Sequence, residues 1–249
     1  MRLSPFAASL LLGAAAAAAN LFGGYVVTRR KHWNEIFLKY FIGLGAGFML
    51  AAVFLRLLPE SLELSPMGPV LVLLGYFLVH FFEHTLAPHF HFGEETHGDV
   101  MLNPAVAYSA LIGLTIHTFF DGVSIASGFL LSFSLGVLIF VAVALHKIPE
   151  GFTVASIALA SGRGVRGAWM STWILAGATL LGVVVMHYFA PAVAYALPLS
   201  TGVTLYVAAS DLIPEVNEQR GLQMAAVVFV GVALFALSSM ALGALGLGE

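Results

Sequence analysis

Two histidine–carboxylate pairs lie inside long apolar runs of the sequence. His117 precedes Asp121 in LTIHTFFDGVS, and His146 precedes Glu150 in ALHKIPEGFTV. Because residues i and i+4 share one face of a helix, each pair can present an imidazole and a carboxylate to the same point. Two imidazoles and two carboxylates form a set of four ligands that suits Zn²⁺ and also accepts Fe²⁺, Mn²⁺ or Cd²⁺. The spacing therefore predicts a metal site shared by two neighbouring helices.

Each pair falls near the centre of its apolar run, where an ionisable side chain is costly and usually marks an ion pathway or a bound partner. The alternative is that each histidine only hydrogen-bonds to its own carboxylate. One pair leaves the two interpretations about even, but the identical spacing of two pairs favours the metal site. Pro149 supports it, because a proline lacks an N–H and leaves the carbonyl of Leu145 without its helical partner. In lipid that carbonyl must be satisfied, and a cavity holding an ion or water would do so.

The composition places these pairs in a membrane. Of 249 residues, 60% are hydrophobic and only 9% are charged, and the mean hydropathy is +0.97, so we predict an all-α integral membrane protein surrounded by the lipid bilayer. A net charge of -3 offers no basic surface, so nucleic-acid binding is not expected. The sequence has no cysteine, so imidazole, carboxylate or neutral oxygen must hold any metal.

Apolar runs long enough to cross the membrane divide the whole chain, and we treat residues 1–249 as a single transmembrane domain. The first run is too long for the apolar part of a signal peptide, so we expect a membrane span there, with a cleaved leader as the lesser alternative. A span needs roughly 20 apolar residues. We place eight spans at residues 5–28, 37–59, 68–88, 104–129, 134–160, 167–189, 192–214 and 222–246.

The basic residues between these spans predict the orientation. If both termini lie outside, the outer side carries Arg2, and the cytoplasmic side carries more basic residues, as is usual for membrane proteins. The basic residues on the cytoplasmic side are then Arg29, Arg30, Lys31, Lys39, Arg163, Arg166 and Arg220. We therefore expect a protein of the cell (inner) membrane with both termini on the outer face.

The second and seventh spans resemble each other. GFMLAAVFLRLLPE at 47–60 and GVTLYVAASDLIPE at 202–215 share Gly, Leu, Leu, Pro and Glu at an offset of 155 residues. In the eight-span topology the two run in opposite directions. An inverted repeat of this kind is typical of secondary transporters that alternate between outward-open and inward-open states.

The stretches from His117 to Gly122 and from His146 to Gly151 resemble the paired H-N-x-P-E-G and (H/Q)-(N/D)-x-P-E-G motifs of the ZIP (Zrt/Irt-like protein) family of divalent metal transporters. The resemblance covers nearly the whole chain. It implies eight helices in a 3+2+3 arrangement and transport of Zn²⁺ or related metals toward the cytoplasm by an elevator-like or rocking movement. A homodimer is one assembly compatible with it.

Several positions differ from the family pattern, and they cluster around a second metal position. Many family members bind two metals there, whereas this sequence offers Thr118 and Lys147 at the corresponding places and no acidic residue between Glu150 and Asp211. Phe120 also replaces the first motif's proline. We therefore expect the Lys147 ammonium to occupy the second cation's place and the site to hold one metal. The alternative is that Lys147 points away and extends toward the membrane surface.

The segment after the third span carries weaker signals. His80, Glu83 and His84 spell the H-x-x-E-H pattern of some zinc proteases, but no soluble catalytic domain surrounds it. With His89, His91 and His97 in a cytoplasmic loop at 89–103, the segment is either a low-affinity metal relay at the exit or a merely polar loop. Asp211 is likewise part of an exit route or an ordinary interfacial helix end.

Three functions use these residues, and a metal transporter fits them best. An intramembrane zinc-dependent hydrolase is the alternative, and it would need an open coordination position and a free general base. The inverted repeat and the lack of a spare carboxylate in mid-membrane argue against it. A proton-conducting channel that uses the His, Asp and Lys side chains is the third interpretation.

Overall fold

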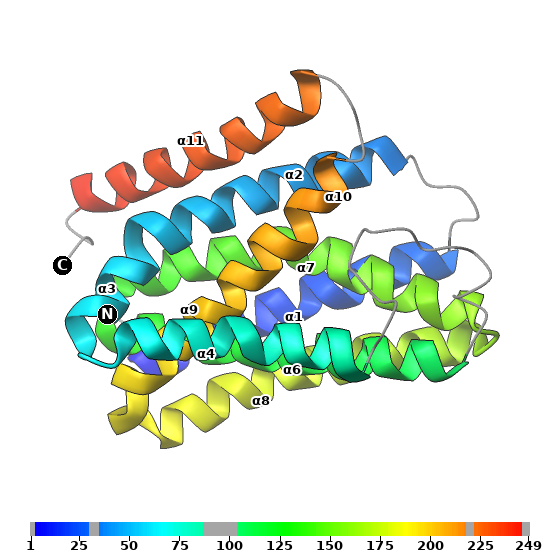
Figure 1. The fold of residues 1–249 in the computed structure, drawn as a ribbon, viewed down its shortest axis with the longest axis horizontal. Coiled ribbons are helices and arrows are strands. Elements are labelled where there is room, and N and C mark those ends of the chain that lie inside the picture. The colour runs from blue at the N-terminus through cyan, green and yellow to red at the C-terminus, as the bar shows by residue number, and fades with distance from the viewer. Residues whose placement is uncertain (1–2, 30–34, 87–103, 218–221, 246–249) are drawn as a thin grey trace.

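The computed structural model describes residues 3–29, 35–86, 104–217 and 222–245, which form a bundle of helices (Figure 1). No β-strand occurs in these ranges, so the predicted all-α class is confirmed. The α-helices are α1 (Pro5–Arg29), α2 (Glu35–Ala52), α3 (Leu58–Leu64), α4 (Gly68–Phe81), α6 (Pro104–Leu131), α7 (Phe133–Ala160), α8 (Gly164–Tyr188), α9 (Val193–Tyr206), α10 (Ile213–Asn217) and α11 (Leu222–Ala244). The other helical segments are the π-helical η1 (Val53–Leu57), η2 (Phe82–Leu86) and η4 (Val207–Leu212) and the 3-10 segment η3 (Ala190–Ala192).

Within the described residues, 7 helical stretches are long and apolar enough to cross a membrane. They correspond to seven of the eight predicted spans. The third predicted span, 68–88, differs. It consists of α4, with 14 residues, and the π-helical η2, so its α-helix is shorter than a typical membrane span.

The helices that carry the two histidine–carboxylate pairs are neighbours because of short, well-defined turns. Between α6 and α7, the Ser132 side chain accepts a hydrogen bond from the N–H of Leu135 at 3.1 Å and so caps the start of α7. Between α7 and α8, Gly162 and Gly164 adopt φ angles of 77° and 64°, which glycine tolerates without steric cost. These turns fold α6, α7 and α8 back against one another.

The packing divides the long helices into two groups. α1, α6, α7 and α8 contact one another, while α4 packs against α9 and α11 packs against α2. The groups meet where α6 contacts α9 and where α7 contacts α2 (Figure 1). The helices with the predicted ligands therefore lie at the boundary between the groups.

Close backbone approach brings α1 against the ligand-bearing part of α7. A Cβ added to Gly151 would collide with the backbone carbonyl of Asn20, and one added to Gly23 would collide with the carbonyl of Ile148. Backbone atoms cannot move aside as the end of a long side chain can. Glycine at these positions therefore lets α1 support the stretch of α7 that carries Glu150.

Replacing Gly151 by alanine is expected to destabilise the protein by about 1–3 kcal/mol, because the added methyl group forces α1 and α7 apart. Thermal unfolding in detergent would measure the effect. Gly113→Ala in α6 is the matched control, since a Cβ there meets nothing within 4 Å and alanine favours the helix. Equal stability of the two variants would contradict the prediction.

The two stretches of the predicted repeat share an unusual backbone feature. In η1 the N–H of Leu58 bonds to the carbonyl of Val53, and in η4 the N–H of Ile213 bonds to that of Ala208, so each is a π turn. The two bonds are separated by the same offset of 155 residues. A proline follows each π turn at an equivalent place, and the helices run in opposite directions (Figure 1). The shared turn supports an inverted repeat.

Candidate metal centre

The four predicted ligands come together in the structure. His117 and Asp121 on α6 and His146 and Glu150 on α7 are all buried, and one potential ligand atom from each lies within 4.8 Å of the others. The i, i+4 spacing on each helix and the antiparallel packing of α6 on α7 produce this convergence.

The two imidazoles and one carboxylate form the tightest part of the cluster. The Nε2 atoms of His117 and His146 lie 3.3 Å apart, and Oδ2 of Asp121 lies 3.2 Å from the first and 3.3 Å from the second. His146 also donates a hydrogen bond from Nδ1 to the Ala142 carbonyl at 3.1 Å. That bond fixes the ring and directs the Nε2 lone pair toward the cluster, as in many metal-binding histidines.

Part of the cluster's hydrogen-bonding capacity is unused. His117 Nδ1 and Asp121 Oδ1 are buried without a hydrogen-bond partner. Buried polar atoms are nearly always paired, so the unpaired Asp121 oxygen is a candidate cation ligand. His117 Nδ1 lies on the ring edge away from the Nε2 atom that meets the cluster, so it does not bear on cation binding.

Lys147 is fully buried and joins the two carboxylates. Its Nζ lies 2.6 Å from Asp121 Oδ2, forms an ion pair with Glu150 and lies 3.2 Å from Thr118 Oγ1. The Thr118 hydroxyl in turn donates a hydrogen bond to the other oxygen of Glu150. The alternative that Lys147 extends to the membrane surface is therefore wrong, because its ammonium lies inside the cluster.

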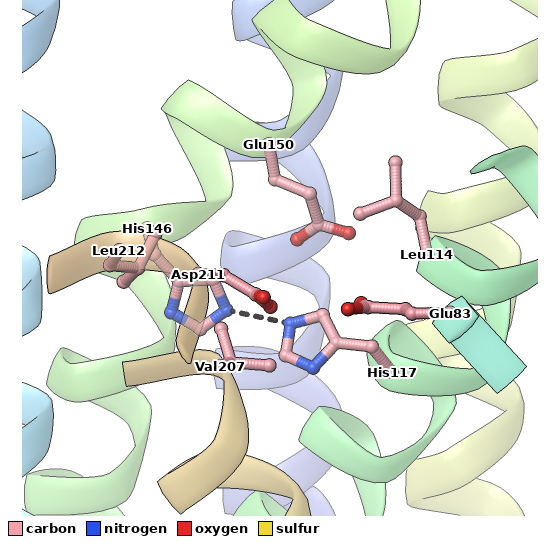
Figure 2. Close-up of a pocket in the computed structure, with 8 residues that line it drawn as sticks. All are labelled: Glu83, Leu114, His117, His146, Glu150, Val207, Asp211 and Leu212. Carbon is pink, nitrogen blue, oxygen red and sulfur yellow. Dashed lines mark hydrogen bonds between the residues drawn. The ribbon is translucent and has the colours of Figure 1, made fainter. Parts of the chain in front are cut away.

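A small pocket opens beside the cluster (Figure 2). The carboxylates of Glu83, from η2, and Asp211, from η4, point into it beside His117 (Figure 2). Their side chains are largely buried, and Glu83 Oε2 and Asp211 Oδ1 have no hydrogen-bond partner. Leu114, Val207 and Leu212 complete the lining. The pocket thus lies between the cluster of the four predicted ligands and two further acidic side chains.

This placement changes three sequence interpretations. Asp211 is not an interfacial helix end, and Glu83 is not part of a merely polar loop, because both are buried in the pocket. The lack of a spare carboxylate no longer argues against a hydrolase, because Glu83 and Asp211 line the pocket beside His117. The H-x-x-E-H pattern could have pointed to Glu83, but nothing in the sequence places it beside His117.

The other histidines of the predicted exit segment are less informative. The ring of His80 is half-buried at the end of α4, with its centroid 6.0 Å from that of Tyr206. The backbone of His84 lies in η2, but its side chain lies outside the described part of the structure. His89, His91, His97 and the rest of the 89–103 loop also lie outside the described residues.

The buried cluster of imidazoles and carboxylates could hold a metal ion, as in helical membrane proteins that move or use metals. Residues 93–239, more than half of the chain, match the model of the ZIP zinc transporter family. The chain belongs to this family.

Individual relatives agree with the family match. The chain is 31% identical to a Drosophila melanogaster zinc transporter ZIP13 homolog over 53% of its own length and 41% of the relative's. It is 23% identical to the human metal cation symporter ZIP8, over 76% of its own length and 57% of the relative's. It is 27% identical to zinc transporter ZIP13 of Pongo abelii, over 82% of its own length and 67% of the relative's. The chain thus spans about half the length of the first two of these relatives.

Proposed function

We propose that the chain carries Zn²⁺ across the cell membrane toward the cytoplasm by alternating access, with His117, Asp121, His146 and Glu150 as its ligands. The observation that carries the proposal is the convergence of these four buried side chains beside one pocket. Nitrogen and oxygen ligands without thiolate bind zinc reversibly, as a carrier requires. Relatives described as zinc transporters and as a metal cation symporter support the same function.

The site is proposed to hold one metal ion at a time, because Lys147 supplies the second positive charge. Its ammonium contacts both Asp121 and Glu150, the carboxylates that would otherwise bridge two metals. The two carboxylates and the ammonium together leave one negative charge, which a single divalent ion more than neutralises. Thr118, which lies beside the Lys147 ammonium, supplies no negative charge for a second divalent ion at that place.

The whole chain is proposed to be one transport domain with eight membrane crossings and both termini outside. α1 begins and α11 ends at the same end of the bundle (Figure 1), which requires an even number of crossings. The seven long helices and the α4–η2 segment supply eight. The inverted repeat then relates the helices around the site in the 3+2+3 arrangement, and movement of one helix group against the other exposes the site to each side in turn.

Glu83 and Asp211 are proposed to receive the ion as it leaves toward the cytoplasm. Both carboxylates line the pocket that contains His117, and each has an unpaired buried oxygen. In the proposed orientation, η2 and η4 lead from the cluster toward the cytoplasmic ends of their helices. A negative charge on this side lowers the barrier for a cation that leaves its four ligands.

The double variant Glu83→Gln, Asp211→Asn is expected to bind zinc normally but to transport it about tenfold more slowly, equivalent to about 1.4 kcal/mol of barrier. Zinc uptake into proteoliposomes and equilibrium binding in detergent would separate the two effects. Glu63→Gln, an exposed glutamate at the far end of α3, is the control. Unchanged uptake in the double variant would remove these residues from the route.

The site also has the groups that a zinc-dependent hydrolase needs. The four ligands could hold the metal, and Glu83 or Asp211 could act as the general base. Ion flux distinguishes the two functions. Purified protein in proteoliposomes with a zinc-sensitive dye inside should give zinc uptake that scales with the amount of protein. Protein that binds zinc but gives no uptake would reject the transporter.

A further inference from the structure

Two buried serines on α6 have hydroxyl groups without a hydrogen-bond partner. Ser124 is 1% exposed and Ser127 is 0% exposed, and neither Oγ finds a donor or an acceptor. Other buried hydroxyls in these helices bond back to their own backbone, as Ser200 does to the Leu197 carbonyl at 3.0 Å and Ser171 to the Gly167 carbonyl at 3.0 Å. Burying an unpaired hydroxyl is costly, so two on one helix call for an explanation.

Both serines lie on the face of α6 that packs against α9. Residues at i, i+4 and i+7 share one helix face, which aligns Ser124 and Ser127 with Phe120. Phe120 packs in a hydrophobic cluster with Val203 and Tyr206 of α9. The unpaired hydroxyls therefore face the boundary between the two helix groups.

The facing surface of α9 also carries a buried serine, Ser200, opposite this part of α6. Ala196, Ser200 and Val203 share one face of α9 by the same spacing. Val203 packs near Phe120, and Ala196 shares a cluster with Ala126 of α6. Ser200, which is 0% exposed, lies between them and thus opposite the stretch of α6 that contains Ser124.

The serines lie on the side of the metal cluster that is opposite to the pocket. The pocket is lined by Leu114 and His117 of α6, which precede Asp121. Ser127 is about 9 Å beyond Asp121 along the helix and about 6 Å short of its end at Leu131, given a rise of 1.5 Å per residue. Asp121 Oδ1 is also unpaired, and Ser124 lies three residues, or about one helical turn, beyond it. These oxygen atoms thus lie along the part of α6 that leads from the cluster toward the end of the bundle where α6 meets α7, and they stop about one turn before it.

We propose that Ser124 and Ser127 line the route by which a partly dehydrated divalent cation reaches Asp121 from the end of the bundle where α6 meets α7. The proposal rests on the transport function proposed above. Hydroxyl oxygens replace water molecules around a hard or borderline cation without binding it tightly. In this structure the α6–α9 contact closes the route, and the hydroxyls are left unpaired until the two helix groups separate.

The alanine variants Ser124→Ala and Ser127→Ala test the hydroxyls themselves. Alanine keeps the small size that the α6–α9 contact needs, so a packing role predicts unchanged transport. The route predicts that the double variant takes up zinc about tenfold more slowly, with zinc binding to the four ligands unchanged. Ser171→Ala in α8 is the control, because its buried hydroxyl is already paired with its own helix.

Cysteine labelling tests access to the route, and the chain is suited to it because it contains no cysteine. In sealed vesicles, Ser124→Cys and Ser127→Cys should react with a membrane-impermeant thiol reagent from the side that labels Tyr188→Cys, which is exposed at the end of α8 near the same end of the bundle. They should be protected from the side that labels Arg166→Cys, at the start of α8. Ser171→Cys should react from neither side.

Unlabelled cysteines at both positions, together with normal transport by the alanine variants, would overturn the route. That result differs from a failure of the proposed function, which would appear as absent zinc uptake by the unmodified protein. Tyr188→Cys and Arg166→Cys mark the two ends of α8, and the side from which the route is labelled is compared with them. The outcome therefore does not depend on which end of the bundle faces the cytoplasm.

Discussion

The variant His146→Ala, Glu150→Ala is expected to abolish zinc uptake in proteoliposomes. The two substitutions remove one imidazole and one carboxylate from four groups whose ligand atoms lie within 4.8 Å of one another. Loss of partners that only orient a metal ligand already weakens binding by about 10–100-fold, so loss of two ligands should exceed 100-fold, or about 2.7 kcal/mol. Uptake should fall to the level of protein-free vesicles.

The measurement needs a control for general damage to the fold. His187→Ala removes an imidazole that stacks on Phe6 with ring centroids 4.0 Å apart and does not line the pocket. It should retain uptake close to that of the unmodified protein. If the His146→Ala, Glu150→Ala variant is folded and still transports zinc, these side chains are not the transport site.

The second large effect is expected for Lys147→Asp, which should convert a site for one zinc ion into a site for two. The substitution removes the ammonium that contacts Asp121 and Glu150 and adds a third carboxylate in its place. Three buried carboxylates repel one another unless cations lie between them, so the variant should depend on zinc for its stability. A second divalent ion would then replace the positive charge that the lysine supplied.

Counting bound zinc by anomalous diffraction, or by elemental analysis of purified protein, would check this. One ion in the unmodified protein and two in Lys147→Asp are the expected numbers. Lys39→Asp, which changes a lysine paired with Glu215 near the start of α2, should leave the number at one. Two ions in the unmodified protein would refute the single-metal proposal.

The sequence predicted that the four side chains converge, because the information for it is local. His117 and Asp121, like His146 and Glu150, are four residues apart on one helix, and a turn at the single residue Ser132 makes their helices neighbours. The periodicity of a helix and the length of the turn suffice to bring them together. The place of Lys147 in the cluster was predicted from the resemblance to the family's second metal position, but its ion pairs depend on rotamers that a sequence does not specify.

The rest of the pocket depends on contacts between distant segments, which the sequence did not predict. Glu83 comes from η2 and Asp211 from η4, and both are π-helical segments. A π turn changes the direction in which later side chains point, so an α-helical pattern misplaces them. The third span shows the same limit, because a hydrophobic run of 21 residues, 68–88, contains an α-helix of 14 residues followed by a π turn.

The matching π turns of η1 and η4 also bear on how the two stretches could be related. A π turn accommodates one residue more than a regular helix of the same course, so deleting a residue from either copy would restore an α-helix there. The stretches 47–60 and 202–215 align without a gap, and their π hydrogen bonds coincide at the offset of 155. If the two halves descend from one ancestral segment, that segment already carried the extra residue, and both descendants have kept it although nine of the 14 aligned residues differ.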